Sequence, residues 1–487
     1  MSSRVVSLSV AMFTAAEIAA AQVIPIQTVP LVPADQFDIF PSLGLAMGGV
    51  SIALADTLHD PFVNPATGAR LRTAHLLGSP TFYGVSDDAG AGRTLPLALF
   101  TAARTWFGGL ALAVQQLDAG RRTPKFDGVV QPLAETSGQL APSAADLRPE
   151  PQTHGNALAF ATLGTTLPGS GLSLGASIRW AKLRAIDGVD MLYPGSTRVE
   201  QFGETSELRF GLLKEWLNGQ SLDAIVVYDR FRMTHDVTFL DTFWDPGSQR
   251  LLQTPRVERN RDVADRRGVQ LKYGHPLGGG GWRIGWLATA NRVSQPNVPN
   301  DDVLSIPRNP GHVNAYELGA GVSRTYGSSL FGMDLVYQPA WSTTSDTAFE
   351  NDFRFSNAVF RMGVSHDVLP VRLEKTLALQ LGLMVRAVHY NLSQQDLVAA
   401  TSQRLEESWL EWTPTWGVSL RFADLELRYR GLVTHGTDRM IPQAPQGFVA
   451  LDQRPNGIFP FPGPATQMAL EGVHVVTHQV SISVPLK

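Results

Sequence analysis

The sequence predicts an all-β protein, a transmembrane antiparallel β-barrel of 14–16 strands. Three observations carry this prediction. Apolar and polar residues alternate with period two from about residue 73 to the end, short turns alternate with long polar loops, and a glycine-rich stretch over 43–69 precedes the first strand. Alternation alone is also typical of a soluble sandwich, so the connections decide between the two folds.

Composition excludes several classes of protein. The chain has 487 residues, of which 17% are charged and 44% hydrophobic. No apolar run of about 18 residues follows the N-terminus, which argues against membrane-spanning helices. A net charge of -4 without a basic stripe gives no indication of a nucleic-acid partner. Because there is no cysteine, disulfides, thiolate metal sites and cysteine nucleophiles are excluded.

Residues 1–21 are typical of a secretory signal peptide. Arg4 supplies the positive start, residues 5–16 form the apolar core, and Ala19, Ala20 and Ala21 form a small-residue cleavage region. Together with the strand pattern, this predicts export to the cell outer membrane.

The predicted strands have one apolar face and one mixed face. Over 377–386, leucines and a valine at the odd positions oppose a mixed face that ends in Arg386, and residues 415–422 alternate in the same way. Strands of ten or more residues suit a tilted span of about 9–11 residues across the hydrocarbon. We count about sixteen candidates, which gives an even strand number and places both termini on one side.

The connections separate into two kinds. Tight turns are expected near 103–106, 166–171, 217–220, 277–281, 325–329 and 422–424, and long polar loops near 119–153, 189–202, 239–262, 294–312, 394–406 and 437–472. Short turns on one side and long loops on the other are typical of outer-membrane barrels. An open sheet edge in lipid leaves backbone groups without partners, so the sheet must close.

Aromatic residues near strand ends fit an interfacial girdle, although a soluble β-core would also use them. They are Trp106, Trp180, Trp282, Trp286, Tyr337, Trp412 and Trp416.

The glycine-rich prelude carries a resemblance to a known family. It reads LGLAMGGVSIALADTLHDPFVNPATGA, and its notable residues are Gly44, Gly48, Gly49, Asp56, Asn64, Pro65 and Ala66. This pattern resembles the N-terminal signature of FadL-like outer-membrane transporters, with Thr67 interrupting the usual Asn-Pro-Ala-Gly. PorV-like barrels of the type IX secretion system look similar at the same place.

The resemblance implies a domain plan and a function. It implies a periplasmic-side hatch over 22–72 that plugs a barrel over 73–487, and passive uptake of hydrophobic or amphipathic molecules such as long-chain fatty acids. A PorV-like scaffold for secretion or surface attachment is the alternative, and a secreted soluble β-protein is a third. The expected partners are outer-membrane lipids, the barrel-assembly machinery and a hydrophobic small-molecule ligand.

No enzyme motif is present in the sequence: there is no nucleophile elbow, zinc-protease helix, phosphate-binding loop or EF-hand loop. We therefore predict no catalytic residue, no metal site and no cofactor.

The faces turned away from lipid are rich in charge. Most are expected to form internal ladders, but an excess of arginine could also hold a carboxylate headgroup. The candidates for such a ligand contact are Arg179, Arg386, Arg421 and Arg428.

Overall fold

The structure is a computed structural model. It describes residues 40, 43–55, 58–85, 90–118, 153–186, 198–245, 247, 250–294, 309–345, 349–368, 376–397, 400–435, 439–442, 468–471 and 474–486. The predicted signal peptide over 1–21 lies outside the described residues.

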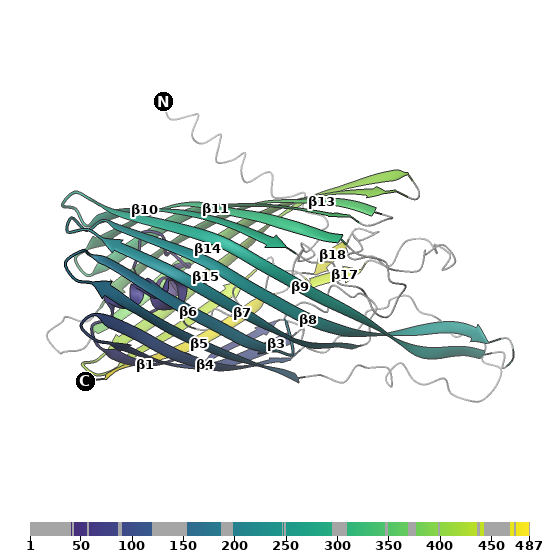
Figure 1. The fold of residues 1–487 in the computed structure, drawn as a ribbon, viewed down its shortest axis with the longest axis horizontal. Coiled ribbons are helices and arrows are strands. Elements are labelled where there is room, and N and C mark those ends of the chain that lie inside the picture. The colour runs from purple at the N-terminus through teal and green to yellow at the C-terminus, as the bar shows by residue number, and fades with distance from the viewer. Residues whose placement is uncertain are drawn as a thin grey trace, which may run out of the picture.

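A single antiparallel sheet closes on itself (Figure 1). Its strands are β1 Ala74–Gly78, β2 Thr81–Val85, β3 Gly90–Ala102, β4 Trp106–Asp118, β5 Thr153–Leu167, β6 Leu172–Leu183, β7 Arg198–Glu215, β8 Ser221–Asp245, β9 Arg250–Leu277, β10 Trp282–Ser294, β11 Asn309–Tyr326, β12 Ser329–Ser345, β13 Phe349–Asp367, β14 Thr376–Asp396, β15 Thr401–Arg421, β16 Glu426–Thr434 and β19 Val475–Leu486. A separate two-stranded sheet joins β17 Arg439–Pro442 and β18 Met468–Glu471.

The closed sheet is a 16-stranded barrel. Its 17 hydrogen-bonded strands include β1 and β2, which keep one register opposite both β19 and β3 and are separated only by Ser79 and Pro80, so they form one wall strand. Pairing of β1 and β2 with β19 closes the barrel, as a wall surrounded by lipid requires. The predicted fold class is confirmed, with the strand number at the upper end of the predicted range.

Side chains of the wall alternate between the lipid and the lumen. On β4, Leu110 and Leu112 are 65% and 67% exposed, whereas Ala111 and Ala113 between them are buried. Of the predicted aromatic girdle, six residues are exposed on the outer face (Trp106, Trp180, Trp282, Trp286, Tyr337 and Trp412). Trp416 instead is half-buried, because it lies over the neighbouring Gly431. An apolar outer band of this kind is the surface that lipid requires, and the protein is an outer-membrane barrel.

Two of the predicted long loops are largely strand. The region 239–262 belongs to the β8–β9 hairpin, whose strands have 25 and 28 residues, and 394–406 belongs mostly to β14 and β15. In Figure 1 the β8–β9 hairpin extends far beyond the wall. Cross-strand ion pairs such as Arg259 Nε to Asp236 Oδ1 at 2.7 Å stabilise this extension where no lipid covers it.

The described residues before β1 lie inside the barrel, at the end where the short turns are (Figure 1). This lumenal segment, residues 40, 43–55 and 58–73, contains the helices η2 Leu43–Met47, α3 Asp60–Val63 and η3 Pro65–Arg70. No helix in the described part of the chain is long and apolar enough to cross a membrane.

Candidate functional site

The first half of the lumenal segment makes a tight turn against β15. Gly48 and Gly49 have φ of 73° and 81°, values that side-chain-bearing residues rarely adopt, and the Gly49 amide donates to Gly44 O at 2.8 Å. The Gly48 amide donates to Thr415 Oγ1 at 2.9 Å, and that hydroxyl donates to Ala46 O at 3.0 Å. The turn is therefore held by the wall as well as by itself.

A buried carboxylate and a lysine hold the next residues. Asp334 on β12 accepts from the amides of Ser51 and Ile52 at 2.7 and 3.1 Å. Lys272 on β9 donates to Ser51 O and Leu54 O at 2.7 and 3.1 Å. Each charged side chain satisfies two backbone groups that have left regular structure, which is how irregular backbone is tolerated within a membrane barrel.

Glycines on the inner wall let the lumenal segment approach the wall closely. They form rows across neighbouring strands, because glycines are directly paired there: Gly332 with Gly363, Gly363 with Gly382, Gly285 with Gly321, and Gly175 with Gly211. A Cβ on these glycines would meet residues of the segment: Met47 and Gly48 at Gly363 and Gly382, Val50 at Gly332, Ile52 at Gly285 and Gly321, and Asn64 to Ala66 at Gly175 and Gly211. Because these glycines have no side chain, the backbone of the segment packs directly against the wall at these rows.

The second half is anchored on the opposite wall by Asn64. Its Oδ1 accepts from the Ala66 amide at 3.0 Å, while its Nδ2 donates to Leu212 O at 3.2 Å and to Asp223 Oδ1 at 3.3 Å. Asn64 and Ala66 are buried at 3% and 0% exposure. The Asn-Pro-Ala turn thus ties the start of η3 to β7 and β8.

Replacing Asn64 with alanine is expected to loosen this turn by about 1–3 kcal/mol, since buried donors and acceptors lose their partners. Hydrogen exchange of residues 60–72, followed by mass spectrometry, should accelerate by about 5- to 150-fold. Asn218→Ala, in the exposed turn between β7 and β8, removes the same side chain where it accepts a hydrogen bond from the Gln220 amide within the turn, and should leave that exchange unchanged. Equal exchange in the two variants would contradict this anchoring role.

Arg70 links η3 to both the segment and the wall. Its Nη1 lies 3.2 Å from Asp60 Oδ2, and its Nε lies 2.9 Å from Glu215 Oε1 on β7. Burial alone would lower the pKa of Arg70, but the carboxylates of Asp223, Glu215 and Asp60 outweigh it and raise that pKa above its ordinary value. The guanidinium is therefore a permanent cation at this contact.

A single buried carboxylate gathers three arginines beside α3. Glu207 on β7, only 4% exposed, accepts from Arg179 Nη2 at 2.9 Å, Arg209 Nε at 2.7 Å and Arg266 Nη2 at 2.7 Å. Nη1 of Arg209 also donates to Phe62 O and Val63 O at 3.1 and 2.8 Å. We call these four charged residues the Glu207 cluster, and it connects wall strands β6, β7 and β9 to the lumenal segment.

An apolar cluster fills the lumen beside β1 to β5. Phe62 stacks on Phe40 with ring centroids 4.1 Å apart and meets Phe100 and Phe160 edge-on or tilted at 4.9 and 5.2 Å. The cluster contains Phe40, Leu71, Leu77, Ala98, Phe100 and Ala111, with Leu58, Phe62, Ala102 and Phe160 packed against it.

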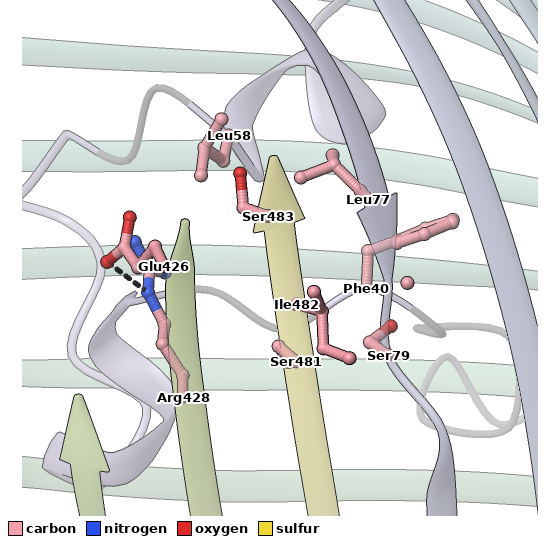
Figure 2. Close-up of a pocket in the computed structure, with 10 residues that line it drawn as sticks. Phe40, Leu58, Leu77, Ser79, Glu426, Arg428, Ser481, Ile482 and Ser483 are labelled. Carbon is pink, nitrogen blue, oxygen red and sulfur yellow. Dashed lines mark hydrogen bonds and ion pairs between the residues drawn. The ribbon is translucent and has the colours of Figure 1, made fainter. Parts of the chain in front are cut away.

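A small cavity of about 30 Å³ lies next to this cluster (Figure 2). Phe40 and Leu58 of the lumenal segment line it, together with Leu77, Ser79, Ser481 and Ser483 of the wall. Glu426 and Arg428 on β16 face it from the polar side. The cavity has about the volume that one water molecule needs, and it brings apolar and charged groups together.

The predicted site residues fall into two groups. Gly44, Gly48, Gly49, Asn64, Pro65 and Ala66 all lie in the lumenal segment, whereas Asp56 lies outside the described residues. The four candidate arginines face the lumen, and each has a carboxylate partner: Arg179 pairs with Glu207 at 2.9 Å, Arg386 with Glu411 at 3.4 Å, and Arg421 and Arg428 share Glu426 at 3.2 and 2.8 Å. They belong to three separate clusters and do not form one site.

Several important residues do not stand out in the sequence. Sequence reasoning does not single out Glu207, Arg266 or Arg70, because an inward charge has no visible partner until the strand register is known. Within the described residues, no group of three or more metal-ligating His, Asp or Glu side chains comes together.

The comparisons with known proteins add similarity at the level of architecture. The chain is similar to the crystal structure of a Pseudomonas aeruginosa FadL homologue, with 10% identity, 92% of this chain and 99% of that chain covered, and a TM-score of 0.47. It is similar to the Pseudomonas putida toluene transporter TodX (13% identity, 92% and 98% covered, TM-score 0.40) and to a bacterial polysaccharide outer membrane secretin (7%, 85% and 99%, 0.41).

No protein-family model matches the sequence, and a search of curated proteins gives no match. The closed wall and its apolar outer band describe a 16-stranded outer-membrane barrel, and the lumenal segment lies inside it.

Proposed function

We propose that the barrel admits hydrophobic or amphipathic small molecules, such as long-chain fatty acids, passively and without a cofactor. The observation that carries the proposal is an apolar lining along one inner wall, which extends from the loop end to the lumenal segment. A water-filled porin has a polar lumen instead. A ligand-binding passage is expected to be mostly apolar with a few placed polar groups.

The lining has two connected parts. At the loop end, inward residues of strands between β4 and β11, together with Ile186 just after β6, form one buried cluster: Ala113, Leu158, Ala181, Leu183, Ile186, Phe231, Met233, Ala264, Val293 and Val313. At the short-turn end, the cluster around Phe62 continues it. Ala111 belongs to the cluster at the short-turn end and Ala113 to the cluster at the loop end. Because they are successive inward positions of β4, the two clusters follow each other along this strand.

An amphipathic ligand would place its headgroup at the polar side of the cavity. Among the four candidate arginines, Arg428 lines the cavity together with Phe40 and Leu58. A ligand carboxylate there would share the Arg428 and Arg421 cations with Glu426, through charge-assisted hydrogen bonds. The lumenal segment then acts as a hatch, because it covers the short-turn end of this route.

The test is uptake of a fluorescent fatty acid by cells whose own hydrophobic uptake channels are deleted. Cells that express the protein should take up more probe than cells with an empty vector. Ala111→Trp fills the lining and should reduce the increment at least about 10-fold, whereas Ala288→Trp places the same ring on the outer face of β10 and should not. No increment over the empty vector would overturn the proposal.

Folding must be separated from blocking in this test. Heat-modifiable migration checks that each variant forms a barrel. If Ala111→Trp does not fold, Leu158→Asn serves instead, since it keeps the size of the side chain but interrupts the lining with an amide. Uptake by Leu158→Asn equal to that of the unchanged protein would count against an apolar route.

One observation favours a scaffold role as the second candidate. Among the described residues, β10 pairs with β9 as far as Asp265, whereas β8 and β9 pair with each other on to Asp245 and Arg250. The hairpin therefore projects beyond the wall (Figure 1) as a long β surface for another protein to bind. Shortening this hairpin should leave fatty-acid uptake intact if the barrel is a transporter. It should abolish co-purification of secretion components if the barrel is a scaffold.

A further inference from the structure

Two arginines on the outer surface of the barrel face each other across neighbouring strands. Arg267 on β9 and Arg292 on β10 are directly paired. Both side chains are exposed, and both lie on the lipid-facing side, as do the next outward pair, Val269 and Ala290. Like charges placed directly opposite each other destabilise a sheet unless something neutralises them.

The arginine next to Arg267 in the sequence faces the lumen and forms ion pairs there. Arg266, one residue away but facing the lumen, lies 2.7 Å from Glu207 and 3.6 Å from Asp229. Within the described residues, Arg267 and Arg292 have no such ion pair. The nearest acidic residue on their face, Asp265, already lies 3.6 Å from Arg230 and accepts from the Tyr228 hydroxyl at 3.3 Å.

The position of the pair along the strands places it at a membrane boundary. Arg292 lies ten residues beyond Trp282 on β10, and Arg267 lies ten residues from Leu277 on β9. Ten residues at a rise of about 3.3 Å, tilted by about 40°, span about 25 Å, which is the height of the apolar band of such barrels. Trp282 and Leu277 lie at the short-turn boundary, so the arginines lie at the loop-side boundary.

The surroundings change character at this level. Towards the short turns the outer face carries Leu271 and Trp286, 51% and 52% exposed. Beyond the pair, β10 ends within two residues at Ser294. In outer-membrane barrels the long loops face outward, so the pair lies at the headgroups of the outer leaflet, where phosphate is the abundant anion.

We propose that Arg267 and Arg292 form a binding site for a phosphate group of an outer-leaflet lipid. The two guanidiniums supply planar donors that match phosphate oxygens and repel each other less once an anion lies between them. Apolar residues below the pair would receive the acyl chains of the same lipid. The site lies on the outer surface and is independent of the proposed uptake function.

The test titrates bis-phosphorylated lipid A into the detergent-solubilised protein and counts bound lipid by native mass spectrometry. Removing both arginines in the double variant R267Q/R292Q should weaken binding about 30-fold, which is about fivefold for each charge removed. R93Q/R354Q removes two exposed outward arginines elsewhere, one beside Gln116 and one paired with Asp352, and should bind as the unchanged protein does.

Two further probes identify the source of the phosphate. Lipid A stripped of its phosphates should lose the preference for the unchanged protein over R267Q/R292Q. Inorganic phosphate in excess should compete only weakly, because it lacks the acyl chains. Equal lipid A binding by R267Q/R292Q and the unchanged protein would overturn the proposal, as would phosphate-free lipid A binding as well as the intact lipid, or inorganic phosphate displacing the lipid fully.

Discussion

Replacing Glu207 with glutamine is expected to lower the free energy of unfolding of the barrel by about 3–5 kcal/mol. Glutamine keeps the size of the side chain, removes its charge and replaces one acceptor oxygen by an NH2 donor that cannot accept from an arginine. Three guanidiniums then remain within a few ångströms of each other in the lumen, where Glu207 alone had accepted from all of them at 2.7–2.9 Å. Asp229, 3.6 Å from Arg266, offsets part of this repulsion for one of the three.

The effect should extend to the lumenal segment. Arg209 holds the carbonyls of Phe62 and Val63 with the same guanidinium that binds Glu207. Once repulsion reorients Arg209, these two carbonyls lose their donor, and α3 should exchange its amides faster. Urea unfolding in lipid vesicles, followed by tryptophan fluorescence, measures the first effect, and hydrogen exchange of residues 60–63 measures the second.

A matched control lies on the same strand. Glu204 faces outward, is about half exposed and lies 4.0 Å from Arg232, so Glu204→Gln should change the stability by less than about 0.5 kcal/mol. If Glu207→Gln and Glu204→Gln unfold at the same urea concentration, the Glu207 cluster contributes nothing beyond an ordinary surface pair.

The sequence predicts the wall well because lipid imposes a simple rule on it. Every second residue must be apolar, so the alternation over 377–386 predicts the two faces of β14, including the inward position of Arg386. The same rule explains the error at 239–262. Outside the membrane no apolar face is needed, and charged residues such as Arg259 and Asp236 stabilise the strands across the ladder instead.

Partners in the lumen could not be predicted in the same way. The alternation of outward and inward residues along a strand predicts that Arg179 and Asp334 point into the lumen. Their contacts, however, depend on the register of several strands, and a slip of one residue would change them. Asp334 is an example: it accepts hydrogen bonds from two backbone amides of the lumenal segment, and the alternation of residues along the strand does not predict these partners. The wall glycines carry a signal, since they recur at inward positions, yet only pairing shows that they form rows.

These rows lead to the second large effect, which is expected for Gly382→Val. A Cβ at Gly382 would meet backbone atoms of Met47 and Gly48, with Met47 Cα only 2.6 Å away. Backbone cannot move aside as a flexible side chain can, so the turn over 44–50 must move away from the wall. The displaced turn also loses its hydrogen bond from the Gly48 amide to Thr415.

The barrel itself should survive this substitution. Valine favours strands, and β14 keeps its pairing with β13 and β15. Overpacking costs of about 1–3 kcal/mol should therefore fall on the contact with the segment, and exchange of residues 44–52 should accelerate by about 5- to 150-fold. Heat-modifiable migration should stay as in the unchanged protein.

A control variant distinguishes the displacement of the turn from the effect of replacing any wall glycine with valine. Gly84 on β2 faces outward, and a Cβ added there would have no atom within 4 Å, so Gly84→Val should leave the exchange of 44–52 unchanged. Because the turn covers the short-turn end of the lumen, Gly382→Val should also raise ion conductance through the barrel in planar bilayers, while Gly84→Val should not. Faster exchange without higher conductance would mean that the segment packs against the glycine rows but does not close the lumen.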